Sequence, residues 1–164
     1  MKNYKDKTNA MRICDTLNLE YNVLTYQAEI DGEYVPLSAS NSLEKIGAEN
    51  ERCFKTIVTK AKSGQYYVFM LPVANELNLK KCAASVGEKS VEPIAVKELL
   101  PLTGYIRGGC SPIGMKKQFV TTIHEDCLCF DKIVFSAGKR GVMFEVDSQE
   151  FLSKFNFAVA DIVL

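Results

Sequence analysis

Residues 104 to 117 read GYIRGGCSPIGMKK, and the rest of the chain is best understood from this stretch. It places four glycines and the pair Ser111-Pro112 within fourteen residues, between two apolar, strand-like runs. This glycine density indicates backbone that turns tightly or approaches another group closely. Exposed amides in such a turn can hold a carbonyl or a phosphate. An ordinary double turn that binds nothing is the competing interpretation.

Two other stretches give this segment its context. Cys53-Phe54-Lys55-Thr56 opens a strong β run to Ala61, and a second run follows from Gln65 to Leu71. Lys62-Ser63-Gly64 between them predicts a hairpin. The sequence SAGKRG at 136–141 separates a further strand pair at 132–136 and 142–146.

Helical and β patterns are interleaved along the remaining chain. Ala10, Ile13, Cys14 and Leu17 predict one face of a helix over 8–18. Further expected elements are a strand at 21–28, a turn at Asp31-Gly32, helices at 43–46, 79–86, 96–100 (ended by Pro101) and 148–155, a strand at 119–123, and a packed apolar tail at 157–164. The pattern predicts a single α+β domain, 1–164, around a mixed sheet.

The composition excludes several classes of protein. The formal net charge is zero, so strong bulk attraction to nucleic acid or to an acidic membrane is not expected, although net charge does not exclude a local basic patch. No apolar run approaches membrane-spanning length. The N-terminal sequence MKNYKDKTNA lacks the apolar centre of a secretory signal, and the six cysteines are dispersed. We therefore expect a cytoplasmic protein with reduced cysteines, which are small buried apolar residues.

Metal or Cys–His chemistry has little support in the sequence. His124 is the only histidine, and nothing places it beside a particular cysteine. A surface or hydrogen-bonded structural role is the favoured interpretation. Cys127 and Cys129 have too few potential ligands near them for a structural zinc site. We expect no metal and no cofactor.

Lys55 interrupts an apolar β run, and strand alternation puts it on the face of Cys53, opposite Phe54 and Thr56. Periodicity alone favours a solvated lysine, whereas a pocket-facing lysine could polarise a carbonyl. Five more cations flank the two glycine-rich turns. They are Arg107, Lys116, Lys117, Lys139 and Arg140. If these turns meet in space, the cations form a basic rim suited to a nucleic-acid backbone, and otherwise they are solvated surface groups.

Taken together, the chain resembles the YbaK/EbsC family of freestanding aminoacyl-tRNA deacylases, which is related to the editing domain of bacterial prolyl-tRNA synthetases. The resemblance rests on FKT at 54–56, LPVANELNLKK at 71–81, TGYIRGGCSPIGMKK at 103–117, SAGKRG at 136–141 and FAVADIV at 157–163. These segments occur in the family's order from about Tyr21 to the C-terminus.

The resemblance implies a curved, partly barrel-like mixed sheet with flanking helices, and hydrolysis of the ester that joins a wrong amino acid to the 3′ end of tRNA. Lys55 matches the family's essential lysine. Tyr26, Thr56 and Ser136 match pocket residues, and Gly108 begins the Gly-x-x-x-Pro element that Pro112 completes. Amides near Gly108 and Gly109 would hold the ester carbonyl. In the cysteine-editing members of the family, the substrate's own thiol attacks that carbonyl.

Two departures bear on the substrate. Ser38 stands where the family often has an aromatic residue, and Met143 stands where it commonly has a polar one. We expect a trans-editing deacylase that acts on Cys-tRNA(Pro). The alternatives are a deacylase for another small amino acid such as alanine, a non-catalytic relative that binds tRNA or a synthetase, and a hydrolase of other small esters or thioesters. The resemblance also implies association with prolyl-tRNA synthetase as a possible source of tRNA specificity.

Overall fold

The computed structural model describes residues 7–25, 27–30, 33–36 and 51–164. The predicted turn at 31–32 and helix at 43–46 lie outside these residues. The elements in chain order are α1 (Asn9–Thr16), β1 (Tyr21–Thr25), β2 (Gln27–Ile30), β3 (Glu33–Pro36), β4 (Phe54–Ala61), β5 (Tyr66–Pro72), α3 (Leu79–Ser85), β6 (Val91–Pro93), α4 (Val96–Thr103), β7 (Val120–His124), the 3-10 helix η2 (Glu125–Cys129), β8 (Lys132–Lys139), β9 (Val142–Asp147), α5 (Ser148–Phe155) and β10 (Ala158–Ala160).

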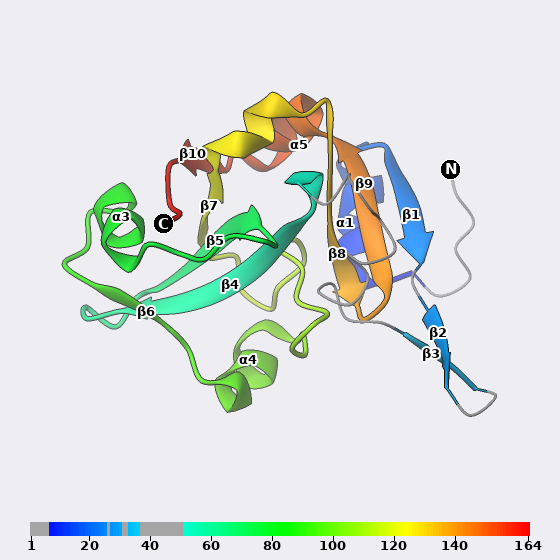
Figure 1. Ribbon diagram of the computed structural model, residues 1–164, viewed down its shortest axis with the longest axis horizontal. Helices are drawn as coiled ribbons and strands as arrows, with labels where there is room; N and C mark the ends of the chain where they lie inside the picture. Colours follow the sequence, from blue (N-terminus) through cyan, green and yellow to red (C-terminus); the bar gives the residue numbers. More distant parts are fainter. Residues whose placement is uncertain (1–6, 26, 31–32, 37–50) are drawn as a thin grey trace.

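A five-stranded mixed sheet, in the order β10-β7-β5-β4-β6, forms one half of the molecule (Figure 1). The predicted hairpin is its centre, because β4 pairs antiparallel with β5 from Phe54–Pro72 to Lys60–Tyr66. The strand β7 adds in parallel to β5, and β10 adds in parallel to β7. The predicted return of the C-terminal tail to the body is therefore confirmed, and the tail supplies an edge strand.

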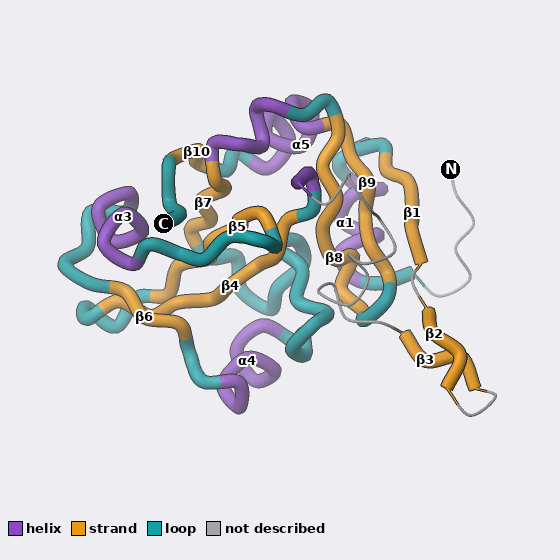
Figure 2. The backbone as a smooth tube through the Cα atoms, viewed as in Figure 1, coloured by secondary structure: helices purple, strands orange, loops and turns teal. Residues whose placement is uncertain are grey.

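The two faces of this sheet bury different partners. On one face, Phe69 and Leu71 pack with Cys82 of α3 and Ile162 of the tail. On the other face, Val58 and Val68 pack with residues of the glycine-rich stretch, which runs as a long loop from α4 to β7 (Figure 2). The buried members of that loop in this cluster are Tyr105, Cys110, Met115 and Phe119. The sheet face therefore fixes the position of the glycine-rich stretch.

A three-stranded antiparallel sheet, β1-β9-β8, forms the other half. Phe135 and Phe144 pack against each other and against Phe151 of α5, and Ala10 and Cys14 of α1 belong to the same core. Thr8 caps α1 through Met11 N, and Asp147 caps α5 through Glu150 N at 2.9 Å, as serine, threonine and aspartate do at helix starts. The predicted helix at 148–155 is therefore confirmed, with Asp147 as its N-cap.

The two sheets meet at one parallel bridge between Cys53 and Val134. From this point β4 and β8 diverge, and the strands described here do not close into a barrel (Figure 1). The expected α+β class with mixed pairing and flanking helices is confirmed.

Two predicted boundaries are wrong. The helix at 96–100 does not end before Pro101, because α4 continues to Thr103 and is closed by Gly104, at φ +84, whose amide bonds to Leu100 O. Pro101 is exposed, so the carbonyl deprived of its amide partner can reach water. The strand predicted to end at Ser136 continues to Lys139, with a register shift between these residues.

Two residues that we expected to be buried are instead exposed to solvent. Leu17 is 37% exposed, and Met11 takes its place in the core. Cys129 is exposed, whereas the other cysteines are buried. No helix in the ranges described above is long and apolar enough to span a membrane.

Candidate functional site

The candidate site lies where β4 and β8 separate. Lys55 and Ser136 each follow the Cys53–Val134 bridge by two residues in the same chain direction, so strand alternation turns both side chains to the face of the bridged pair. Cys53, Val134 and Met143 pack together on that face and form its apolar floor. The structure thus brings together two residues that are 81 positions apart in the chain, as the numbering shows.

Lys55 is half-buried rather than freely solvated. Burial lowers the pKa of its ammonium group, and the negative charge of Glu76 opposes that shift. In the described part of the chain, the ammonium has no hydrogen bond or ion pair. A half-buried cation that has no hydrogen bond or salt bridge can form a strong interaction with an incoming carbonyl oxygen or anion. The sequence did not single out Glu76, because only the folded chain brings it near Lys55.

The segment that carries Glu76 is held in place by its neighbours. Val73 N donates to Cys53 O at 2.9 Å, and Val73 packs on the apolar floor. At the other end, Leu164 N donates to Glu76 O at 3.1 Å. The C-terminal tail therefore fixes the backbone that places the carboxylate near Lys55.

Thr56 projects from the opposite face of β4, the face that packs on the glycine-rich stretch. Its Oγ1 is buried and makes no hydrogen bond within the described residues. An unpaired buried hydroxyl costs about 1–3 kcal/mol, so such groups are rare in protein interiors. A ligand that reached this hydroxyl would remove the cost.

Ser136 is 6% exposed, and its Oγ accepts a hydrogen bond from Gly138 N at 3.2 Å. Met143 lies directly across from Ser136 in the β8–β9 ladder and is 2% exposed. The sulfur-containing side chain therefore adds an apolar wall next to Ser136. Tyr26 and Ser38 lie outside the described residues.

The glycine-rich stretch supplies free backbone donors. Gly108 has φ +85, a conformation that favours glycine. Gly109 N donates to Ile106 O at 3.0 Å, so this particular amide is already paired. The amides of Gly108 and Cys110 donate no hydrogen bond anywhere in the described chain. The thiol of Cys110 stays protonated, because burial raises its pKa to about 12.

The two glycine-rich turns do meet in space. A Cβ on Gly109 would lie 3.0 Å from Arg140 N and 3.2 Å from Lys139 C, so a side chain there would collide with backbone. Arg140 Nε donates to Arg107 O at 2.8 Å across the contact. Three of the five predicted cations, Arg107, Lys139 and Arg140, therefore gather beside Gly109. Lys116 and Lys117 form a separate group beside α4 and Phe119.

Tyr105 holds both turns, a role that the sequence did not reveal. Its hydroxyl donates to Ile113 O at 2.7 Å, and its ring is so close to Gly138 that a Cβ there would lie 2.9 Å from Cε1. The start of α1 supports the same backbone, since Thr8 Oγ1 donates to Ala137 O at 2.6 Å and Asn9 Nδ2 donates to Gly114 O at 2.9 Å. In the sequence, the only feature that could have pointed to this role is that Tyr105 is an aromatic residue within a glycine-rich stretch.

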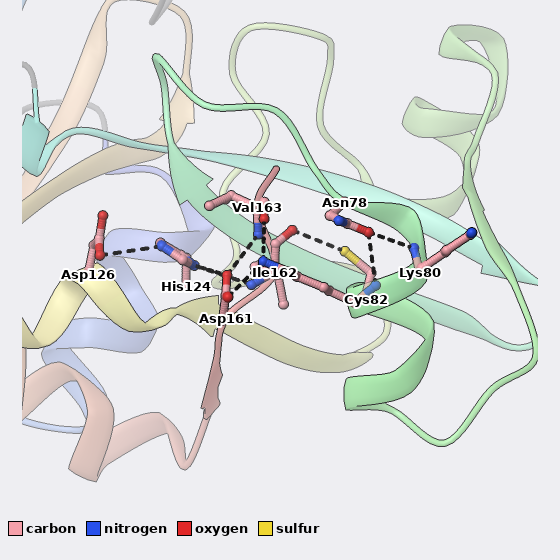
Figure 3. A network of polar contacts seen from close by, with 9 residues as sticks. Asn78, Lys80, Cys82, His124, Asp126, Asp161, Ile162 and Val163 are labelled. Carbon is pink, nitrogen blue, oxygen red and sulfur yellow. Dashed lines mark hydrogen bonds and ion pairs between the residues drawn. The ribbon is translucent and has the colours of Figure 1, made fainter.

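His124 belongs to the scaffold, as its favoured interpretation predicted. It is 4% exposed, and its Nδ1 accepts a hydrogen bond from Ile162 N at 3.3 Å (Figure 3). Its Nε2 lies 3.4 Å from a carboxylate oxygen of Asp126. Among the described residues, no group of three or more histidine, cysteine, aspartate or glutamate side chains could hold a metal ion.

Comparisons with known proteins identify the family of the chain. Residues 37–154 match the model of the aminoacyl-tRNA editing domain. The chain is 42% identical over 161 residues, covering 98% of itself and 96% of the relative, to EbsC of Enterococcus faecalis, which is named as a candidate Cys-tRNA(Pro)/Cys-tRNA(Cys) deacylase.

Two solved structures share the fold. Hypothetical protein APE2540 superposes with a TM-score of 0.84 at 20% identity, covering 96% of this chain and 100% of the other. A candidate trans-editing enzyme for prolyl tRNA synthetase gives 0.75 at 23% identity, covering 97% and 99%.

Proposed function

The chain belongs to the aminoacyl-tRNA editing domain family, and from this premise we propose that it hydrolyses the aminoacyl ester of mischarged tRNA, with Cys-tRNA(Pro) as its substrate. The observation that carries the proposal is the unpaired ammonium of Lys55 in a partly desolvated position beside Ser136. The name of the E. faecalis relative supports the cysteinyl substrate.

Each described group has a role in this reaction. Lys55 binds the carbonyl end of the aminoacyl ester, and the free amides of Gly108 and Cys110 stabilise the oxyanion that forms on it. Ser136 orients the aminoacyl group on the face of Lys55, Thr56 contacts the substrate from the face of β4 that packs on the glycine-rich stretch, and Tyr26 is assigned to the pocket by its match to the family. Because Gly109 has no side chain, the loop can approach the backbone of Lys139 and Arg140 closely.

The nucleophile in this reaction is the thiol of the substrate itself. The sulfur of the cysteinyl side chain attacks its own carbonyl carbon, the bond to the ribose oxygen breaks, and the thiol proton passes to that oxygen. The products are a cyclic thiolactone and deacylated tRNA. Holding thiol and carbonyl together supplies most of the rate, because the reaction is intramolecular.

The apolar floor fits a small side chain. Met143, Val134 and Cys53 offer no polar partner that would select a hydroxyl or a carboxylate. Alanine is the second candidate, because packing alone discriminates weakly between side chains that differ by one small group. A binding-only relative is the candidate from another class, and Met143 in place of a polar residue is the observation that favours it.

Selectivity for the tRNA body is assigned to other contacts. Arg107, Lys139 and Arg140 beside Gly109, with Lys116 and Lys117 beyond them, are suited to the phosphates of the 3′ end. The structural neighbour named for prolyl tRNA synthetase suggests that synthetase as a partner. With these partners, we propose a cytoplasmic location for the protein.

The deciding experiment compares Cys-tRNA(Pro) with Ala-tRNA(Pro), side by side and without synthetase. Rapid loss of only the cysteinyl ester supports the proposal. Preferential loss of the alanyl ester keeps the deacylase class but replaces the thiol by an activated water or a tRNA hydroxyl. Tight binding of charged tRNA with no turnover of either ester would replace the proposal by the binding-only candidate.

A further inference from the structure

A groove lies between α4 and the β4–β5 hairpin, away from Lys55. It encloses about 470 Å³ and is lined by Tyr66, Lys97, Glu98, Pro101 and Leu102. In Figure 1, α4 lies below the sheet formed by β4 and β6. The end of α4 leads directly into the glycine-rich stretch, so the groove and the candidate site are connected by one continuous segment of chain.

Lysines from three elements converge on this groove. Lys97 lines it directly. Lys60 Nζ lies 5.4 Å from the centre of the Tyr66 ring, and Lys116 Nζ donates to Pro101 O at 3.4 Å. Both contacts are with residues that line the groove, so these two ammonium groups lie at its edge.

A fourth lysine joins through an aromatic pair. The rings of Tyr66 and Phe119 are 5.6 Å apart, and Lys117 Nζ lies 6.0 Å from the Phe119 ring. Basic side chains interleaved with aromatic rings are typical of surfaces that bind single-stranded nucleic acid.

Two carboxylates accompany the lysines and do not cancel them. Glu98 accepts a hydrogen bond from Ala95 N at 2.9 Å, which holds its charge at the start of α4. Glu92 faces Lys60 across the β4–β6 ladder. Four cations against two carboxylates leave the groove positive.

The opposite half of the molecule provides the contrast. A cavity of about 630 Å³ near α1, β1 and α5 is lined by five carboxylates and one lysine, Lys132. The carboxylates are Asp15, Glu20, Glu145, Asp147 and Glu150. A polyanion would avoid that cavity and favour the groove.

We propose that the groove binds the sugar-phosphate backbone of the tRNA acceptor arm, an assignment that rests on the proposed function. Thr56 and Lys60 are four residues apart on β4, or about 14 Å at strand spacing. A few nucleotides of an extended strand can span this distance. Thr56 and Lys60 project from the same face of β4, so an aminoacyl end that reaches Thr56 leaves the adjoining backbone within reach of the lysines.

The test uses the double variant Lys60→Ala/Lys97→Ala, with Lys132→Ala from the acidic cavity as the matched control. The double variant should raise KM for full-length Cys-tRNA(Pro) about tenfold and reduce the salt dependence of log KM by about two. It should cleave cysteinyl-adenosine at the wild-type rate, because that substrate ends at the candidate site. Unchanged KM and salt slope, or an equal loss in Lys132→Ala, would overturn the assignment.

Binding of uncharged tRNA, followed by fluorescence anisotropy, separates this inference from the proposed function. If wild-type protein cleaves neither ester, the proposed function fails, and the groove is still tested by affinity for tRNA. A tenfold weaker Kd in the double variant alone supports the groove. Equal Kd values for all three proteins overturn it.

Discussion

Two polar regions of this protein differ in how completely their groups are paired. Around the C-terminal tail, Lys81 Nζ contacts Asp161 at 2.7 Å and Val163 O at 3.0 Å. In the same region, His124 Nδ1 accepts a hydrogen bond from Ile162 N (Figure 3). Around the β4–β8 divergence, the ammonium of Lys55 and the hydroxyl of Thr56 have no hydrogen-bond partner among the described residues.

The difference separates scaffold from site. A folded chain pairs its buried polar groups because an unpaired one costs free energy. The tail network follows this rule and holds β10 and α3 against the five-stranded sheet. The ammonium of Lys55 and the hydroxyl of Thr56 do not follow this rule, and a substrate carbonyl or hydroxyl would supply the missing hydrogen-bond partner. The comparison therefore predicts opposite effects of mutation in the two regions.

The largest effect is expected for Lys55→Ala. We expect about 10²- to 10³-fold loss of kcat/KM for Cys-tRNA(Pro), because the variant loses a charge that acts on the ester carbonyl. The free energy of unfolding should change by less than about 1 kcal/mol, since the ammonium has no partner in the described structure. Deacylation rates and urea denaturation check both values.

Lys81→Ala is the matched control, because Lys81 is a lysine with two partners. It should leave kcat/KM unchanged and lower stability by less than about 1 kcal/mol. Comparable turnover by folded Lys55→Ala would end the proposed role of Lys55.

His124→Ala should show the reverse behaviour. Removing a buried ring leaves a cavity and deprives Ile162 N of its acceptor, so the free energy of unfolding should fall by about 2 kcal/mol. At a temperature where the variant remains folded, deacylation should match wild type. A loss of kcat larger than the loss of folded protein would assign His124 to the chemistry instead.

The hairpin, both glycine-rich turns and the cap at Asp147 could be predicted, because strand-forming runs, glycines and capping residues act locally. The end of α4 could not be predicted from Pro101, since Gly104 and an exposed carbonyl tolerate the proline. The match of Lys55 to a family motif drew attention to it, whereas Glu76 and Tyr105 depend on contacts between segments distant in sequence.

Thr56→Val should change activity and stability in opposite directions. The variant loses a hydroxyl that is assigned to the substrate, so kcat/KM should fall about tenfold. It also removes an unpaired buried hydroxyl, so the free energy of unfolding should rise by up to about 1 kcal/mol. The measurements are deacylation rates and urea midpoints.

Ser148→Ala controls for burial alone, because Ser148 Oγ is the other buried, unpaired side-chain oxygen among the described residues. It lies at the start of α5, so its activity should equal wild type. A matching activity loss in Ser148→Ala would show that the Thr56 result has no connection with substrate.

The smallest effect concerns a paired carboxylate on the β9 strand. Asn22 Nδ2 and Arg52 bond to Glu145 at 3.0 and 2.8 Å, and these bonds hold its pKa below the usual 4.5. Its stabilisation is present above pH about 4.5 and is lost as the pH falls through the folded pKa. Glu145→Gln should be about 1 kcal/mol less stable than wild type at pH 7, with the gap closing below pH about 4.5. A gap that does not narrow as the pH falls below about 4.5 would contradict this linkage.

The most direct test of the central claim is NMR of lysine ammonium groups during titration with a non-hydrolysable, amide-linked cysteinyl-adenosine. The unpaired group should acquire a partner, so the Lys55 resonance should shift saturably while the Lys81 resonance stays in place. Saturable binding that leaves Lys55 unshifted would show that its missing partner is not the substrate, and would contradict the account.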